Sequence, residues 1–129
     1  MADNEYFASF VTMKRWLENR NEGKSLAKYF TEHGYKRVGL YGAGELGNLL
    51  YAELRDTDIE VAYFVDKNSE GLAVVKGKPV ISPEEITKHS PIDALIVTPI
   101  GNFNEICTDL IRIAPNVAVV SLRDAVYEL

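Results

Sequence analysis

Three glycines with the spacing of a phosphate-binding turn stand between residues 42 and 47. The apolar run 38–41 comes directly before them and a leucine-rich amphipathic segment follows, as in a strand, a tight turn and a helix. Gly42 would permit the turn, Gly44 would let the backbone approach a pyrophosphate, and Gly47 would let the helix pack closely on the strands. The pattern predicts a dinucleotide-type βαβ unit with phosphate at the helix N-terminus. The candidate cofactor-binding residues of this loop are Gly42, Ala43, Gly44, Glu45, Leu46 and Gly47.

An acidic residue ends the second apolar run. Asp66 lies nineteen residues after Gly47, where a carboxylate accepts hydrogen bonds from both hydroxyls of a nucleoside ribose. This carboxylate would repel the 2'-phosphate of NADP, and the adjacent Lys67 lacks the bidentate fork of an arginine. We therefore expect Asp66 and Lys67 to bind NAD in preference to NADP. The alternative is that Asp66 only caps the turn 66–69.

Three further residues bear on this predicted site. Glu45 at the helix N-terminus would be stabilised by the helix dipole by about 0.3 to 1 kcal/mol, but a pyrophosphate would need the same field. Its carboxylate repels phosphate if it faces the pocket and is harmless if it faces solvent. Thr98 and Asn102 follow the fourth predicted strand, across the switch point of the sheet, and are candidates to contact a ribose or diphosphate. Asn102 equally suits a helix cap after a Pro-Gly turn.

The sequence predicts no catalytic residue and no metal site. Tyr63 and Lys67 have the Y-x-x-x-K spacing of a proton-transfer pair, but Tyr63 falls in a predicted strand, where four residues span roughly 13 Å. His33 and His89 fall near predicted helix ends. Cys107 shares a helical face with apolar residues and is expected to pack in the core. Whether the chain is an enzyme is therefore left open.

Short apolar runs alternate with helical segments after residue 36, which indicates a parallel sheet covered on both faces. Residues 4–33 before them read as two helices separated by 21–23. Right-handed crossovers predict the strand order 3-2-1-4-5. The expected fold is an α/β, Rossmann-like three-layer sandwich preceded by two helices, in a single domain 1–129 with a helical extension 4–33 and a βαβ core 36–129. The five predicted strands are 38–41, 61–65, 79–81, 94–97 and 117–120.

Composition excludes several classes of protein. The formal net charge is −5 and the charges are mixed along the chain, which argues against nucleic-acid binding. No apolar run approaches the length of a membrane span, and the N-terminus lacks the basic start of a secretory signal. The single cysteine excludes an internal disulfide and a multi-cysteine zinc site, so we expect a cytoplasmic protein.

The segments 38–47, 62–68 and 77–85 together resemble a known group, the Rossmann-type nucleotide-binding domains of bacterial surface-polysaccharide biosynthesis. Similar domains stand at the N-termini of nucleotide-sugar dehydratases and epimerases and of PglD-like sugar acetyltransferases. The resemblance covers roughly residues 36–122. Its most distinctive string is Gly77-Lys78-Pro79-Val80-Ile81-Ser82-Pro83-Glu84-Glu85. The resemblance implies that NAD or a nucleotide sugar binds near Gly42, Gly44, Gly47 and Asp66.

In those relatives a separate downstream domain carries the chemistry. This chain ends at Leu129, so we expect a nucleotide-binding module that acts with a partner or as a detached accessory domain. One alternative is a small NAD-dependent oxidoreductase, epimerase or dehydratase that works as a homodimer through the N-terminal helices. Another is a ligand-free interaction scaffold. Leu40 and Leu46 stand where the loop of S-adenosylmethionine methyltransferases carries an acid and a glycine, which argues against that class.

Overall fold

The computed structural model describes residues 2–72 and 74–129; Met1 and Ala73, which belong to the predicted domain 1–129, lie outside the described residues. The helices are α1 (Ala2–Asn21), α2 (Leu26–Glu32), α3 (Glu45–Leu54), α4 (Ser69–Leu72), the 3-10 helix η1 (Pro83–Lys88), α5 (Phe103–Ile113) and α6 (Leu122–Glu128). The strands are β1 (Arg37–Tyr41), β2 (Glu60–Val65), β3 (Val74–Val75), β4 (Lys78–Ile81), β5 (Ala94–Val97) and β6 (Ala118–Ser121).

The described strands form one six-stranded sheet in the order β3-β4-β2-β1-β5-β6. All neighbouring pairs are parallel except β3 and β4. The predicted strand order lacks β3, because this strand has only two residues and lies in a segment without alternating hydrophobicity. Lys76 and Gly77 both have positive φ, 54° and 78°, which suits the two-residue turn of a tight hairpin.

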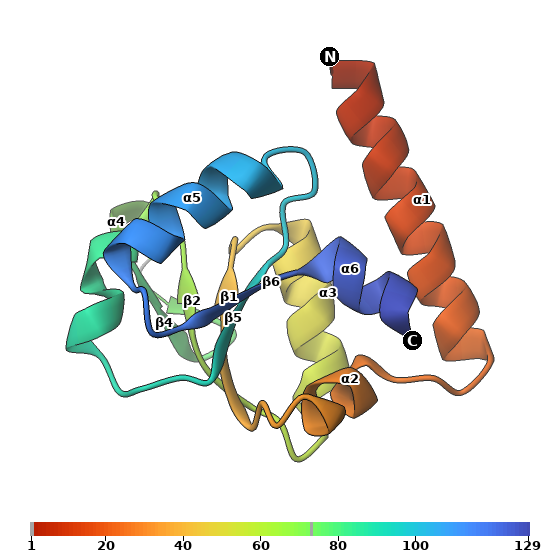
Figure 1. Cartoon of the computed structure of the whole chain (residues 1–129), viewed down its shortest axis with the longest axis horizontal. Coiled ribbons are helices and arrows are strands. Elements are labelled where there is room, and N and C mark those ends of the chain that lie inside the picture. Colours follow the sequence, from red (N-terminus) through yellow and green to blue (C-terminus); the bar gives the residue numbers. More distant parts are fainter. Residues whose placement is uncertain (1, 73) are drawn as a thin grey trace.

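Helices cover both faces of the sheet (Figure 1). Successive residues of a strand point to opposite faces, so Leu40 belongs to one buried cluster and Tyr41 to the other. The first cluster contains residues of α2, α3 and α6, and the second contains residues of η1 and α5. The chain is therefore an α/β sandwich whose sheet is buried on both sides.

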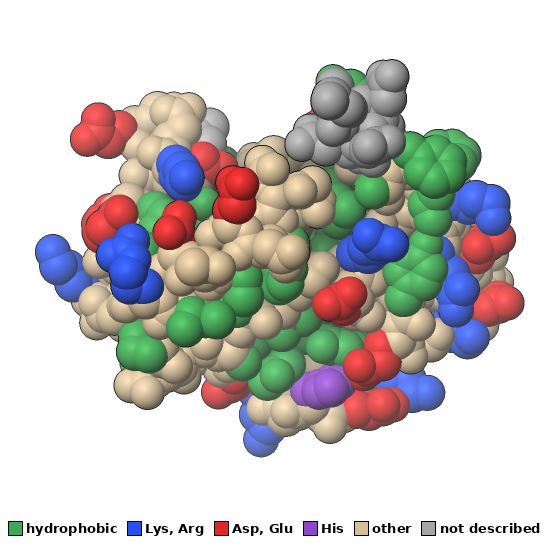
Figure 2. Space-filling view, turned by 45° about the horizontal axis from the view of Figure 1, so that its top comes forward, with side chains coloured by type: hydrophobic (Ala, Val, Ile, Leu, Met, Phe, Trp, Pro, Cys, Tyr) green, Lys and Arg blue, Asp and Glu red, His purple; other side chains and the backbone are tan. Residues whose placement is uncertain are grey.

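The two predicted N-terminal helices are present as α1 and α2. The first half of α1 stands away from the body of the molecule, while its second half lies beside α6 (Figure 1). Asn19 in that second half is 1% exposed, and its side-chain amide donates a hydrogen bond to the carbonyl of Val126 at 2.9 Å. Hydrophobic side chains follow α1 along the right-hand side of the molecule in Figure 2. The helix therefore contacts the body with one face and leaves another face open.

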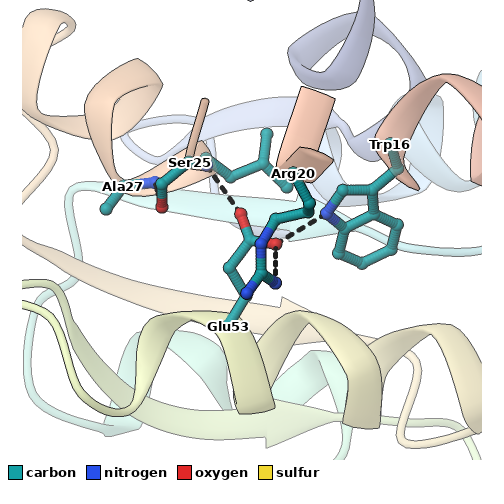
Figure 3. Close-up of polar contacts among 6 residues, drawn as sticks. Trp16, Arg20, Ser25, Ala27 and Glu53 are labelled. Carbon is teal, nitrogen blue, oxygen red and sulfur yellow. Dashed lines mark hydrogen bonds and ion pairs between the residues drawn. The ribbon is translucent and has the colours of Figure 1, made fainter. Parts of the chain in front are cut away.

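A buried carboxylate joins α1, α2 and α3 (Figure 3). Glu53 of α3 is 8% exposed. Its Oε1 accepts hydrogen bonds from Trp16 Nε1 at 2.8 Å and from Arg20 at 2.7 Å, and its Oε2 accepts from the backbone N–H of Leu26 at 2.7 Å. Burial of a charge is costly unless it is paired and hydrogen-bonded, and these three donors satisfy that condition. Glu53 thus fixes the position of α1, although nothing in the sequence distinguished it from other acidic helix residues.

The capping pattern at residues 82–85 forms a 3-10 helix in place of a regular α-helix. The Glu85 carboxylate accepts hydrogen bonds from the backbone N–H of Ser82 at 3.1 Å and from its hydroxyl at 2.8 Å. These bonds lower the pKa of Glu85 below its usual value.

Among the helices of residues 2–72 and 74–129, none combines the length and the apolar composition needed to cross a membrane.

Candidate functional site

Packing requires a glycine at two positions, one in the loop between β1 and α3 and one in the first turn of α3. Gly42 has φ of 99°, and a Cβ at this position would lie 2.6 Å from the Thr98 hydroxyl oxygen. Gly47 lies in the first turn of α3, where a Cβ would come within 2.0 Å of the Gly42 carbonyl oxygen. Because atoms cannot approach so closely, a side chain at Gly42 would push against Thr98 and Pro99 after β5, and one at Gly47 would displace α3 from the end of β1. These two positions therefore account for the sharp turn and for the close helix packing.

Gly44 differs from the other two glycines. It is the N-cap residue of α3, with φ of −89° and ψ of −155°, a conformation open to any L-residue. No heavy atom lies within 4 Å of a Cβ built there, and the residue is exposed. The fold thus supplies no packing reason for a glycine at position 44. The space in front of it is the open approach that the motif would need for a phosphate.

The remaining three loop residues divide between core and solvent. Ala43 is 8% exposed and belongs to the first hydrophobic cluster, and Leu46 packs against the same cluster. The Ala43 side chain is therefore unavailable to a ligand, while that of Leu46 is partly exposed. Glu45 is exposed in the first turn of α3, where its charge stabilises the helix dipole.

Asp66 ties the end of β2 to the glycine loop. Its Oδ2 accepts a hydrogen bond from the backbone N–H of Ala43 at 3.0 Å, and its Oδ1 accepts from the N–H of Asn68 at 2.9 Å. The second bond is the turn cap that was the alternative interpretation of this residue. Each carboxylate oxygen has a further lone pair, and the side chain is half-buried. The adjacent Lys67 is exposed.

Thr98 and Asn102 lie at the end of β5 and at the start of α5. Thr98 is 2% exposed, and its hydroxyl donates to the carbonyl of Tyr41 at 2.7 Å. Thr98 therefore holds β5 to β1 beneath the glycine loop and does not present its hydroxyl to solvent. Asn102 is the exposed N-cap residue of α5, but its side chain makes no capping hydrogen bond.

Two cavities lie near the carboxyl ends of the strands, and residues of α5 line both of them. The first has a volume of about 350 Å³ and the second about 490 Å³. The first cavity is lined by Tyr41, Lys67, Ser82, Pro83, Glu84, Ile106, Asp109, Leu110, Arg112 and Ile113. The second is lined by Ile100, Gly101, Asn102, Phe103, Asn104, Glu105, Ser121, Arg123 and Asp124.

Of these lining residues, only Lys67 and Asn102 were expected at a binding site from their positions in the sequence. The residues at the ends of β4 and β6 could also have been predicted, because ligands of open α/β sheets bind outside the carboxyl ends of the strands. Ser82 follows β4, and Ser121 ends β6. The contributions of α5 could not be found in this way, since they depend on how that helix packs across the sheet.

Tyr41 is the buried polar residue of the first cavity. Burial raises the pKa of its hydroxyl above the usual value, and the carboxylates of Asp66, Asp109 and Glu84 raise it further. The side chain is 7% exposed. Tyr41 therefore remains neutral at physiological pH and offers a hydroxyl donor to a ligand rather than a base.

The titratable residues considered from the sequence lie elsewhere. His33 ends α2 and pairs with Glu128 at 2.6 Å, and His89 ends η1. Cys107 is half-buried, whereas the core was expected, because the buried stripe of α5 is narrow and centres on Leu110. Within residues 2–72 and 74–129, no group of three or more His, Cys, Asp or Glu side chains is arranged to hold a metal ion.

No curated protein was found to match this chain. A family model described as C2185-like, N-terminal, matches residues 34–119, about two thirds of the chain. The match begins just before β1 and ends within β6, so it includes the glycine loop, Asp66 and the whole first cavity, while α1 and α2 precede it. The chain belongs to the C2185-like, N-terminal family.

Proposed function

We propose that this chain is a Rossmann-like nucleotide-binding module that holds NAD or a nucleotide sugar across the carboxyl edge of its sheet. The observation that carries the proposal is the open space at Gly44, at the N-terminus of α3. Asp66 accepts a hydrogen bond from the neighbouring Ala43 N–H, and two cavities lie near the carboxyl ends of the strands. A linear ligand with a central diphosphate and a group at each end would extend from Gly44 toward the two cavities.

The diphosphate would lie at Gly44. The first N–H groups of a helix have no partner within the helix, and together with the helix dipole they favour an anion. The open space at Gly44 lets a phosphate approach this backbone. The exposed Glu45 is harmless to such a ligand as long as its carboxylate stays in solvent.

The ribose and base would lie toward the first cavity. Both oxygens of Asp66 retain a lone pair for the ribose hydroxyls, and the neutral Tyr41 lies within the same cavity. The side chains of Pro83, Ile106 and Leu110 supply apolar walls for a flat base. A cavity of about 350 Å³ is at the lower end of the size of small-molecule sites.

The second cavity would receive the other end of the ligand. Its volume of about 490 Å³ is sufficient for a sugar or a nicotinamide nucleoside. Arg123 and Asn102 line it and would donate hydrogen bonds. By its resemblance, the module serves a bacterial surface-polysaccharide or sugar-nucleotide pathway in the cytoplasm, together with a partner enzyme that carries the catalytic residues.

The second candidate function is a ligand-free interaction scaffold. The observation that favours it is the hydrogen bond from the Ala43 N–H to Asp66, which places a carboxylate against the glycine loop. A carboxylate there takes up part of the positive field that a diphosphate needs.

Isothermal titration calorimetry with NAD, NADP and UDP-sugars tests the proposal on the wild type and on Gly44→Val. The valine fills the open space, so we expect the affinity for the preferred nucleotide to fall at least tenfold while the unfolding temperature changes little. Ala52→Val, which adds a side chain on the exposed face of the same helix, should bind as the wild type does. Absence of binding by the wild type to all of these nucleotides would favour the scaffold, and equal affinity of Gly44→Val would overturn the assigned phosphate position.

A further inference from the structure

Helix α1 carries a stripe of exposed hydrophobic side chains. Tyr6, Phe10, Met13 and Leu17 are 76%, 63%, 42% and 61% exposed, and they follow one another at intervals of four, three and four residues. This is the spacing of the apolar seam of a coiled coil. Figure 2 shows hydrophobic side chains along this side of the molecule. We call these four residues the outer stripe of α1.

The outer stripe cannot turn toward the core of its own chain. A different face of α1 carries Thr12, Trp16 and Asn19, which are 0%, 6% and 1% exposed. Trp16 is bonded to Glu53, and Asn19 is bonded to the carbonyl of Val126. Because these bonds fix the rotation of the helix, a partner outside this chain must cover the stripe if it is to be buried.

A groove between α1 and α3 runs along the second half of the stripe. It has a volume of about 480 Å³ and is lined by Phe10, Met13 and Leu17 of α1 and by Leu49 of α3, among others. Leu49 is itself 47% exposed. The first half of α1, by contrast, stands away from the body (Figure 1). The second half of the helix therefore borders a groove, and the first half projects from the body and is free to enter a groove of another molecule.

We propose that α1 pairs in antiparallel orientation with α1 of a second copy of this chain. The stripe is self-complementary in that register, since Tyr6 then meets Leu17 of the partner subunit and Phe10 meets the partner's Met13. The standing first half of each helix enters the groove of the other copy. A parallel pairing would set groove against groove and first half against first half, so that neither first half would enter a groove.

The area of the patch is sufficient for this dimer. An aromatic side chain buries about 150 to 250 Å², so the outer stripe together with the exposed Phe7 and Leu49 offers roughly 600 Å² per chain. Two copies would bury roughly 1,200 Å² in total, the lower limit of a specific interface. A patch of this size on a soluble monomer typically marks an interaction site.

Sedimentation equilibrium of the full chain tests the dimer. At roughly 100 μM, above the dissociation constants of small specific interfaces, we expect a dimer for the wild type and a monomer for Phe10→Glu, whose dissociation constant should rise about a hundredfold. Ile111→Glu, which changes an exposed hydrophobic residue on α5, should remain dimeric. A monomeric wild type, or a Phe10→Glu variant that dimerises as tightly as the wild type, would overturn the proposal.

Disulfide trapping tests the orientation in a Cys107→Ser background. Tyr6→Cys and Leu17→Cys change only the outer contacts and leave Phe10 and Met13 in place. A mixture of the two variants should form a mixed disulfide far faster than either variant alone forms its own. Faster cross-linking of each variant with itself would contradict the antiparallel register.

Discussion

The glycine loop and helix α1 are attached to the body of the molecule in different ways. In the loop, two of three glycines are held by backbone and side-chain atoms that leave no room for a Cβ, and the third faces open space. In α1, one face is tied down by a buried carboxylate and the other lies bare. Each region therefore contains a structural part and a part that the fold does not use. Gly44 and the outer stripe have no role in packing, and we propose that a nucleotide binds at the first and a second copy of the chain at the other.

The largest expected effect separates the two kinds of glycine. Gly47→Ala puts a Cβ 2.0 Å from the Gly42 carbonyl oxygen, and overpacking of this severity should lower the free energy of unfolding by about 3 kcal/mol. Gly44→Ser, at an exposed N-cap where serine is favoured, should leave it within about 0.5 kcal/mol. Urea unfolding of both variants measures the difference. Equal destabilisation by the two substitutions would show that Gly44 is structural as well.

The next effect concerns the attachment of α1. Glu53→Ala leaves Trp16 Nε1, the Arg20 guanidinium and the Leu26 N–H without their acceptor, which should cost about 3 kcal/mol of unfolding free energy. The fluorescence of Trp16, the sole tryptophan, should shift to longer wavelength as α1 loosens. Glu18→Ala removes the exposed ion pair with Lys14 and should cost less than about 0.5 kcal/mol. An unshifted emission spectrum in Glu53→Ala would mean that α1 is held by other contacts.

The smallest expected effect concerns Asp93, which lies near the amino end of β1, away from both the glycine loop and the outer stripe. The Asp93 carboxylate accepts hydrogen bonds from the backbone N–H groups of Arg37 and Lys36, which lower its pKa below the ordinary value of 3.8. Since the folded pKa is the lower one, the ionised carboxylate stabilises the fold above pH 3.8 and this contribution is lost as the pH falls through the folded pKa.

When the pH is lowered from neutral into the acid range, the melting temperature of Asp93→Asn should therefore fall less than that of the wild type. Thermal unfolding as a function of pH measures this, with the exposed Asp58→Asn as the control. Identical acid profiles for Asp93→Asn and the wild type would show that the two hydrogen bonds add nothing to the fold.

The elements with strong local signals could be predicted from the sequence. The apolar runs that became β1, β2 and β5 are continuous and buried, and the turn glycines mark the start of α3. Strand β3 could not be predicted because a two-residue pair depends on the hairpin turn at Lys76 and Gly77. Glu53 was missed because only tertiary packing buries an acidic residue of an amphipathic helix.

In the candidate site, too, some positions could be predicted from the sequence and others depend on tertiary packing. Spacing placed Asp66 beside the glycine loop, and the structure joins them through the Ala43 N–H. The burial of Thr98 could not be foreseen, because its hydroxyl bonds to a strand that is distant in sequence. The α5 residues that line the first cavity depend on the packing of that helix over the sheet and have no local signal.

We expect a nucleotide diphosphate to bind at Gly44, with the two ends of the ligand directed toward the two cavities. Nuclear magnetic resonance of the ¹⁵N-labelled chain, titrated with NAD and then with a UDP-sugar, tests it residue by residue. We expect the amide signals of Gly44, Glu45 and Leu46 to shift most, followed by those of residues lining the two cavities. Unchanged loop amides with both ligands, or shifts confined to other parts of the surface, would contradict it.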